Sequence, residues 1–410
     1  MRYGSKTTLA LVAAVAGFIS IVPVANCAPP PSGSKRFLLS EKVNSADVSP
    51  DENTVAVERT IKTKRTDGTP IFEDVLELWK FHSGTTVARR AFRQTEAQPS
   101  QRIDLVQVVD PRFVRYSNDG HSLVAYLDNT IILFRASDLS PAGTISLSIP
   151  DSKTRSVTTK TGIHVITERP KVQAMEVSPT APLAAILWVR GDLWGRLDIY
   201  DFSSRQLVAQ WGLPQGWWAA LDQHHGIAWD SALPRIFLAL PTDCSRALHT
   251  SNVFSAGVQA KRASFKLCTG FHLGDIAITH DNELVAVVAN SVGIVKNHHP
   301  SMKVFSLGTG NLIRRVKVDN GARYRVSVAP RANRIVAWTS DMRCALHWVD
   351  WSPECRNQVV KAMFTVWRLP DFKVVTEQEV SPPNGLGLRI SAHGHFVLTY
   401  GNNVQVFQID

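Results

Sequence analysis

The chain has 410 residues, of which 44% are hydrophobic and 20% charged, an ordinary composition for a protein with a globular core. Its length suits two or three average domains or one long closed all-β domain. The formal net charge of +10 indicates a basic surface, with basic clusters at 59–65, 89–102 and 153–171. Such a surface is either simply soluble or has affinity for acidic polymers or anionic membranes.

Residues 1–27 predict a signal peptide. Arg2 and Lys6 supply a positive start, residues 9–22 are apolar and uncharged, and small residues precede Ala28. The apolar run is too short, and too closely followed by three prolines at 29–31, for a membrane span. We therefore expect an exported protein, periplasmic or secreted, for which a nucleic-acid partner is excluded.

Cys27 has two readings. Cleavage after Cys27 leaves small residues at the −3 and −1 positions of the cleavage site. The tetrapeptide Val24-Ala25-Asn26-Cys27 also resembles a bacterial lipoprotein box, although Asn26 departs from the small residue that the box requires. Membrane attachment is expected only if Cys27 is lipidated.

Four cysteines remain after Cys27 is removed or lipidated, and an oxidising compartment favours two disulfides. The pairing Cys244–Cys268 and Cys344–Cys355 is favoured because each pair lies within one repeat. A zinc site is the alternative, but no C-x-x-C or His-Cys spacing supports it.

After a linker at 28–35 that is rich in Pro, Ser and Gly, a short motif recurs seven times. It places two apolar residues two positions apart, as on one face of a strand, before a polar turn that contains Ser, Thr or Ala with Pro, Asp, Gly or His. The instances lie at 46–51, 114–120, 175–179, 227–231, 276–281, 326–330 and 388–394.

Each motif is followed by a strongly apolar strand, and further strands complete the repeats. The second strands are predicted at 54–57, 122–127, 183–189, 235–240, 284–289, 334–339 and 396–400. Third strands are predicted at 76–81, 131–135, 196–202, 303–307, 364–369 and 404–409, and fourth strands at 206–211, 312–318 and 373–380. In the less regular fourth repeat, these strands are placed at 251–256 and 260–267.

The two ends of the chain indicate how the repeats close. The seventh repeat stops after three strands, and an orphan strand at 36–40 precedes the first. An N-terminal strand that completes the last sheet removes exposed edges. The sequence therefore predicts an all-β fold over residues 36–410: a seven-bladed β-propeller with four antiparallel strands per blade, closed three plus one.

The chain resembles the WD40-like and quinoprotein amine dehydrogenase-like propeller superfamily. The resemblance rests on Val48-Ser49-Pro50-Asp51, Leu197-Asp198-Ile199-Tyr200-Asp201-Phe202 and Val304-Phe305-Ser306-Leu307-Gly308-Thr309-Gly310. The Gly-His dipeptide of WD40 repeats is missing, and Trp-Asp is replaced by Leu78-Trp79-Lys80 and Val366-Trp367-Arg368. The resemblance implies a fold that serves enzymes, ligand binders and scaffolds alike.

Long predicted loops gather on the face that carries the connections between strands two and three and between blades. They lie at 59–74, 94–111, 150–171, 213–225, 290–300 and 340–362. Aromatic anchors are predicted there, with histidines and basic side chains beside them. The candidates are Trp217, Trp218, His224, His225, Trp348, Trp351, Arg59, Lys62, Lys64 and Arg65.

Each candidate has a plainer reading. The tryptophans of the 213–225 loop could instead plug the top of the ring, and adjacent histidines without a carboxylate at motif spacing do not predict a metal site. No sequence motif for catalysis is present, and no cofactor is expected. We therefore expect a non-enzymatic protein that binds a protein, peptide or glycan. The alternatives are an enzyme or cofactor-associated subunit acting on a sugar, lactone or amine, and a subunit of an exported assembly.

Overall fold

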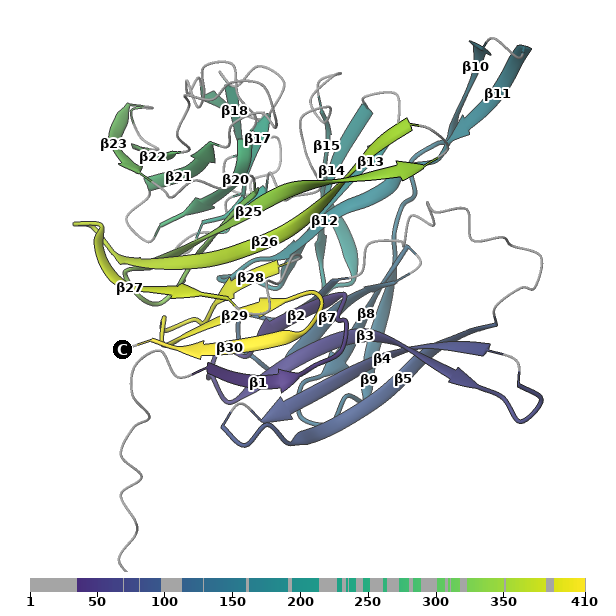
Figure 1. Ribbon diagram of the computed structural model, residues 1–410, viewed down its shortest axis with the longest axis horizontal. Coiled ribbons are helices and arrows are strands. Elements are labelled where there is room, and N and C mark those ends of the chain that lie inside the picture. The colour runs from purple at the N-terminus through teal and green to yellow at the C-terminus, as the bar shows by residue number, and fades with distance from the viewer. Residues whose placement is uncertain are drawn as a thin grey trace, which may run out of the picture. The chain divides into compact units, whose positions relative to one another are not determined.

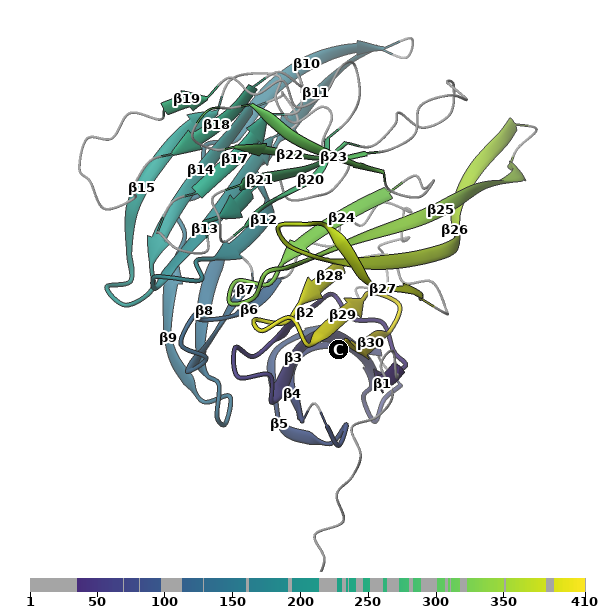
Figure 2. The same ribbon diagram turned by 90° about the vertical axis from the view of Figure 1, so that its left-hand side faces the viewer.

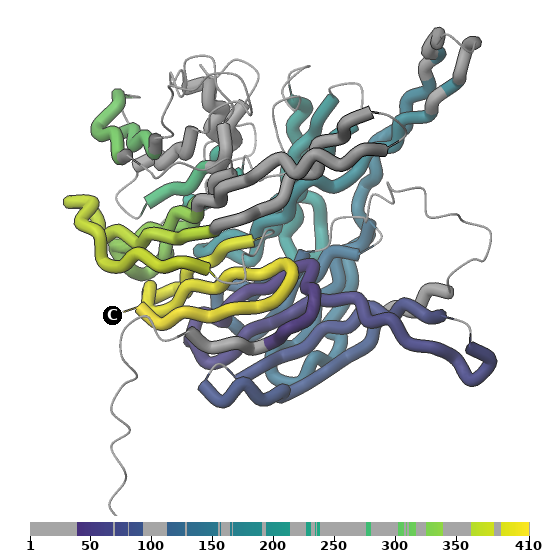
Figure 3. The backbone as a smooth tube through the Cα atoms, in the orientation of Figure 1, coloured from purple at the N-terminus to yellow at the C-terminus, as the bar shows by residue number. Residues whose placement is uncertain are grey.

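In the computed structural model, all regular secondary structure of the described residues is β-strand. The structure describes residues 35–409, with gaps of which the longer are 97–112, 214–226, 251–260, 264–272 and 289–300 (Figure 3). Within the described residues, no helix has the length and apolarity needed to span a membrane. The predicted signal peptide, the linker up to residue 34 and Cys27 lie outside these residues.

Seven four-stranded antiparallel sheets are formed by the described residues (Figure 1). Six of them consist of four consecutive strands. These are β2–β5 (Ser45–Val48, Thr54–Lys64, Pro70–Lys80, Thr86–Glu96), β6–β9 (Phe113–Tyr116, Ser122–Leu127, Thr130–Arg135, Pro141–Ser146), β12–β15 (Lys171–Val177, Leu183–Arg190, Trp194–Asp201, Gln206–Leu213), β16–β19 (Ile227–Trp229, Ile236–Leu240, Arg246–Thr250, Lys261–Ala263), β20–β23 (Leu273–Ile278, Glu283–Val288, Ser301–Ser306, Leu312–Lys317) and β24–β27 (Arg323–Val328, Arg334–Val349, Ser352–Arg368, Lys373–Glu379).

The last sheet combines both ends of the described chain. It contains β28 (Gly387–Ile390), β29 (Phe396–Tyr400), β30 (Val404–Gln408) and the N-terminal strand β1 (Lys35–Leu39). Strand β1 runs antiparallel to β30, with Lys35 opposite Phe407 and Leu39 opposite Val404. The predicted completion of the last sheet by an N-terminal strand is confirmed.

The first strand of each sheet contacts the first strand of the next. Strand β2 contacts β6, and the succession continues through β12, β16, β20, β24 and β28, which also contacts β2. All seven predicted motif strands are thereby confirmed as the first strands of sheets.

The core lies between neighbouring sheets. In one cluster, Val124 and Tyr126 of β7 pack with Met175 of β12 and Trp188 of β13. Trp188 is fully buried, and its indole N–H donates to the equally buried Asp198 at 2.9 Å. Burying each such apolar side chain stabilises the fold by about 1.5–3 kcal/mol.

A recurring serine closes the turn between the first and second strands. Its hydroxyl oxygen accepts a hydrogen bond from the backbone N–H five residues later, which fixes the start of the second strand. The pairs are Ser49 with Thr54 (2.9 Å), Ser117 with Ser122 (2.9 Å) and Ser391 with Phe396 (3.0 Å). The turn residues of the sequence motif therefore have a direct structural role.

Several predicted loops are instead strands. The range 59–74 belongs largely to the β3–β4 hairpin, and 340–362 to the β25–β26 hairpin, which Figure 2 shows as long paired arrows. The range 150–171 contains an additional hairpin, β10 (Lys153–Thr159) with β11 (Gly162–Glu168). These segments lie beyond the apolar stretches that predict the strands, yet their backbones pair.

The strand positions in the fourth sheet also differ from the prediction. Its third strand, β18, lies at Arg246–Thr250, before the predicted 251–256, and β19 (Lys261–Ala263) falls within the predicted 260–267, of which the other residues are not described. Strand β18 pairs with β17, with Thr250 opposite Ile236. The alternation of apolar residues in 246–250 is weak, which explains the misplacement.

Candidate functional site

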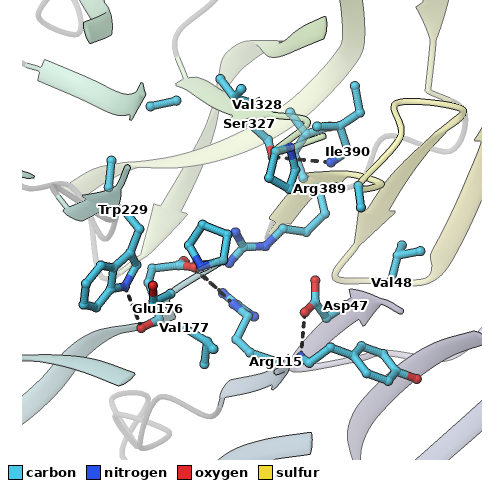
Figure 4. A pocket seen from close by; sticks show the side chains of 18 of the residues that line it. Asp47, Val48, Arg115, Glu176, Val177, Trp229, Ser327, Val328, Arg389 and Ile390 are labelled. Atoms are coloured by element: carbon cyan, nitrogen blue, oxygen red, sulfur yellow. Dashed lines mark hydrogen bonds and ion pairs between the residues drawn. The ribbon is translucent and has the colours of Figure 1, made fainter. Parts of the chain in front are cut away.

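A cavity of about 310 Å³ lies among the seven first strands (Figure 4). Each of these strands contributes residues to its lining. The middle residue of each apolar–x–apolar motif is part of the lining, since it alternates with the two apolar residues along the strand. These middle residues are Asp47, Arg115, Glu176, Ala228, Ala277, Ser327 and Arg389.

Glu176 of β12 is the centre of a charged network in this cavity. Its Oε1 atom accepts a hydrogen bond from Nη2 of Arg389 at 2.6 Å and from Nη2 of Arg115 at 3.2 Å. Its Oε2 atom accepts from Nε of Arg115 at 3.4 Å. Arg389 lies on β28, so one carboxylate connects three sheets (Figure 4).

Arg115 is held in place from its other side. Its Nη1 atom donates to the backbone carbonyl of Val114 at 2.8 Å and to the hydroxyl of Ser45 at 3.2 Å. The same hydroxyl accepts from the Val114 N–H at 3.1 Å. The Arg115 side chain is only 4% exposed, so its donors are committed to the protein.

Asp47 is the second carboxylate of the cavity. Its Oδ2 atom accepts a hydrogen bond from the Tyr116 N–H at 2.9 Å, whereas Oδ1 accepts none from a described residue. Burial raises the pKa of Asp47 above its ordinary value, although the guanidinium groups of Arg389 and Arg115 oppose this shift. Asp47 therefore presents one carboxylate oxygen without a described protein donor.

Arg389 has one hydrogen-bond donor without a partner among the described residues. Its Nε atom is buried and has no hydrogen-bond partner among the described residues. Burial disfavours the charged form, but Glu176, Tyr400 and Asp47 together raise the pKa of Arg389, so it stays a cation. A buried donor without a partner costs free energy, which a bound acceptor would recover.

The opposite part of the lining is small and uncharged at the motif positions. Ala228 and Ala277 are both buried, and the Ser327 hydroxyl accepts the Ile390 N–H at 3.3 Å. Trp229 closes one side, and its indole N–H donates to the Glu176 carbonyl at 3.1 Å. At the motif positions, charged side chains thus lie on β2, β6, β12 and β28, whereas β16 and β20 contribute alanines; β24 adds Arg325 to the lining from outside its motif position.

Most predicted site residues lie elsewhere or outside the described residues. Trp217, Trp218, His224, His225 and Trp351 are not described. For Trp348, the structure describes only the backbone, within β25. Lys62, Lys64 and Arg65 are exposed at the tip of the β3–β4 hairpin. Arg59 is 8% exposed and pairs with Glu77 through two hydrogen bonds of 2.9 and 3.1 Å.

The predicted disulfides stay predictions. Cys244 and Cys268 lie outside the described residues. Backbone register places Cys344 opposite Asn357 and Cys355 opposite Leu346, so these two cysteines occupy diagonal positions on paired strands. Among the described residues, no group of three or more His, Cys, Asp or Glu side chains is arranged to hold a metal ion.

Sequence reasoning missed the charged cavity, although the signal was present. The apolar residues of the motif predict the strands, whereas the residue between them contributes to the cavity. Asp47, Arg115, Glu176 and Arg389 are charged residues at equivalent positions of strands that are otherwise apolar. A repeat that carries charged residues at its middle position in several copies, within otherwise apolar motifs, is a cue for a shared polar centre.

No protein-family model matches the chain, and no curated protein matches it either. The site must therefore be interpreted from its own geometry.

Proposed function

We propose that residues 36–410 form a seven-bladed β-propeller, closed by the pairing of β1 with β30. The succession of contacts between the first strands supports this architecture, because β28 contacts both β24 and β2. The resemblance to WD40-like propellers agrees with it. An exported location follows from the proposed signal peptide at 1–27.

This propeller acts as a binding protein whose cavity takes a small polar molecule. The observation that carries the proposal is the pairing of Asp47 Oδ1, which has no described partner, with the Arg389 guanidinium, whose side chain is 22% exposed. Both belong to residues that line a cavity of about 310 Å³, at the small end of the range for ligand sites. Polar groups placed in this way fix the orientation of a ligand and select its chemistry.

Binding is favoured over acid–base catalysis. Both oxygens of Glu176 accept hydrogen bonds from arginines, which leaves Asp47 as the one cavity carboxylate with an oxygen open to a ligand among the described residues. Hydrolytic sites with paired carboxylates need one acid and one base or nucleophile. The cavity does not offer two such groups.

Native mass spectrometry of the exported protein tests this proposal. We expect the wild-type protein to retain a small molecule that is lost on denaturation, whereas Ala277→Phe, which fills the cavity without changing its charge, carries none. A thermal-shift screen against small-molecule fractions from the cells that produce the protein extends the test to weak ligands. If both proteins show equal masses and equal responses in the screen, the proposal is wrong.

A second proposed role is binding of an acidic protein, peptide, glycan or surface on the extended hairpins. The favouring observation is the exposed group of Lys62, Lys64 and Arg65 at the tip of β3–β4. Since Arg59 is engaged by Glu77, it stabilises the base of this hairpin and is not part of the proposed contact surface.

A further inference from the structure

The structure indicates the chemical class of the ligand, an inference that rests on the proposed function of the cavity. We propose that the cavity binds a small carboxylate that also carries an ammonium or hydroxyl group, that is, an amino acid or a hydroxy acid. Its carboxylate would contact Arg389, and its ammonium or hydroxyl group would donate to Asp47.

Arg389 is suited to a carboxylate. Its Nη2 atom is bound to Glu176 at 2.6 Å, while Nε has no described partner. Guanidinium groups bind carboxylates through paired, charge-assisted hydrogen bonds. The contact with Glu176 holds the side chain in the cavity, and the 22% of the side chain that stays exposed is open to the ligand's carboxylate.

Asp47 supplies the complementary acceptor. Its Oδ1 atom accepts no hydrogen bond from a described residue, and Asp47 forms no ion pair with one within 4.0 Å. Yet Asp47 and Arg389 are close enough for each to shift the pKa of the other. A molecule with a hydrogen-bond acceptor at one end and a donor at the other can contact Arg389 and Asp47 at the same time.

The charge of the lining favours an anionic group over a cation. Its described charged side chains comprise four arginines and two carboxylates: Arg115, Arg325, Arg331, Arg389, Asp47 and Glu176. A simple amine would add positive charge to a cavity in which arginines are already in excess, at a cost in free energy. A zwitterion or a singly charged hydroxy acid avoids that cost.

The rest of the ligand has space beside Ala228 and Ala277. Each has a single methyl group where the equivalent positions of four other sheets carry charged side chains. Trp229 and Ile278 also line this side and offer apolar contact. The cavity therefore selects on the shared carboxylate and donor groups and accommodates a side chain of modest size.

Pairs of ligands that differ in one group test the carboxylate and the donor group separately. The twenty L-amino acids, lactate and glycolate would be tested by thermal shift and calorimetry against alaninamide and lactamide, which lack the carboxylate charge. We expect at least one acid to raise the Tm and the amides to have no effect. Arg389→Met and Ala277→Phe should each abolish binding, and Asp47→Asn should weaken the binding of an amino acid about tenfold.

Near-ultraviolet circular dichroism of each variant establishes that its fold is retained. If Arg389→Met does not fold, Asp47→Asn and Ala277→Phe still decide the result, since neither alters the Glu176 contacts. A bound neutral sugar whose affinity Arg389→Met leaves unchanged would overturn the ligand class and support the cavity function. Absence of any bound or stabilising molecule would overturn both.

Discussion

Glu52 shows how a single residue can connect distant parts of the chain. It lies in the turn between β2 and β3, is 7% exposed and has a φ of 59°, which is unusual for a residue other than glycine. Its carboxylate accepts from the His393 N–H at 2.8 Å and contacts Nδ1 of His395 at 2.8 Å. The first sheet is thereby joined to the turn between β28 and β29.

Loss of the Glu52 charge should destabilise the protein in a pH-dependent way. Burial raises the pKa of Glu52, but hydrogen bonds from Ser391, His395 and His393 outweigh burial and hold it below its ordinary value of 4.5. A lowered carboxyl pKa contributes stability above pH 4.5 that is lost as the pH falls through the folded-state value. Glu52→Gln should therefore cost about 2 kcal/mol at pH 7.

Urea unfolding of both proteins between pH 7 and pH 3 measures this effect. The difference in free energy of unfolding should narrow below pH 4.5. Glu379→Gln, which removes the charge of an exposed carboxylate, should change stability little at any pH. A difference for Glu52→Gln that stays constant with pH would show that its charge makes no contribution.

The residues at this contact were identified from the sequence only in part. The motif at 388–394, which contains His393, was correctly expected to end in a polar turn before the next strand. Its partner Glu52 is more than 340 positions away, and only the arrangement of the sheets brings them together. The contacts in the charged cavity also join residues that are far apart in the sequence, since Arg389 and Glu176 are 213 positions apart.

At the scale of whole elements, the hairpin strands are longer than the sequence pattern predicts. Strand alternation was followed only while apolar residues continued, so the second strand of the first repeat was ended at Val57. In the structure, β3 continues to Lys64, and Ile61 lies opposite Glu73 of β4. Backbone pairing requires no apolar side chain, and threonines and paired charges sustain these extensions.

The exposed charges at the tip of β3–β4 lead to a test of the second proposed role. Replacing Lys62, Lys64 and Arg65 together by Glu should lower affinity for poly-L-glutamate at least tenfold at low salt, because attraction becomes repulsion. Fluorescence anisotropy at several salt concentrations measures this affinity, which should fall with salt for the wild type.

A matched variant controls for net charge. Lys42, Arg135 and Lys373 are also exposed, and replacing these three by Glu changes the total charge equally. We expect this variant to bind poly-L-glutamate more tightly than the hairpin variant does. Equal losses in the two variants would mean that overall charge, and not the hairpin, determines binding.

For the molecule as a whole, the repeat pattern predicted the number and order of strands in each sheet. The seven motif strands and the N-terminal strand all lie where alternation and turn residues placed them. The pattern could not place the contacts between side chains of different sheets, since those depend on which strands become neighbours. It thus predicted the fold more completely than the cavity within it.

Removal of β1 should weaken the entire protein. A chain that begins at residue 41 lacks the partner of β30 and exposes that edge, whereas a chain that begins at residue 33 retains it. We expect the shorter chain to melt about 5 °C or more below the longer one and to aggregate more readily. Calorimetry with light scattering measures both effects, and equal Tm values would show that β1 adds no stability.

The pairing of β1 with β30 also constrains how the protein is made. The first described strand to leave the ribosome, β1, is hydrogen-bonded to the last described strand, β30. During synthesis β1 has no partner, and contacts over such sequence separations form slowly. The last sheet is therefore completed only after β30 has been synthesised, and a nascent chain that stops before β30 carries an unsatisfied strand that can pair with other chains.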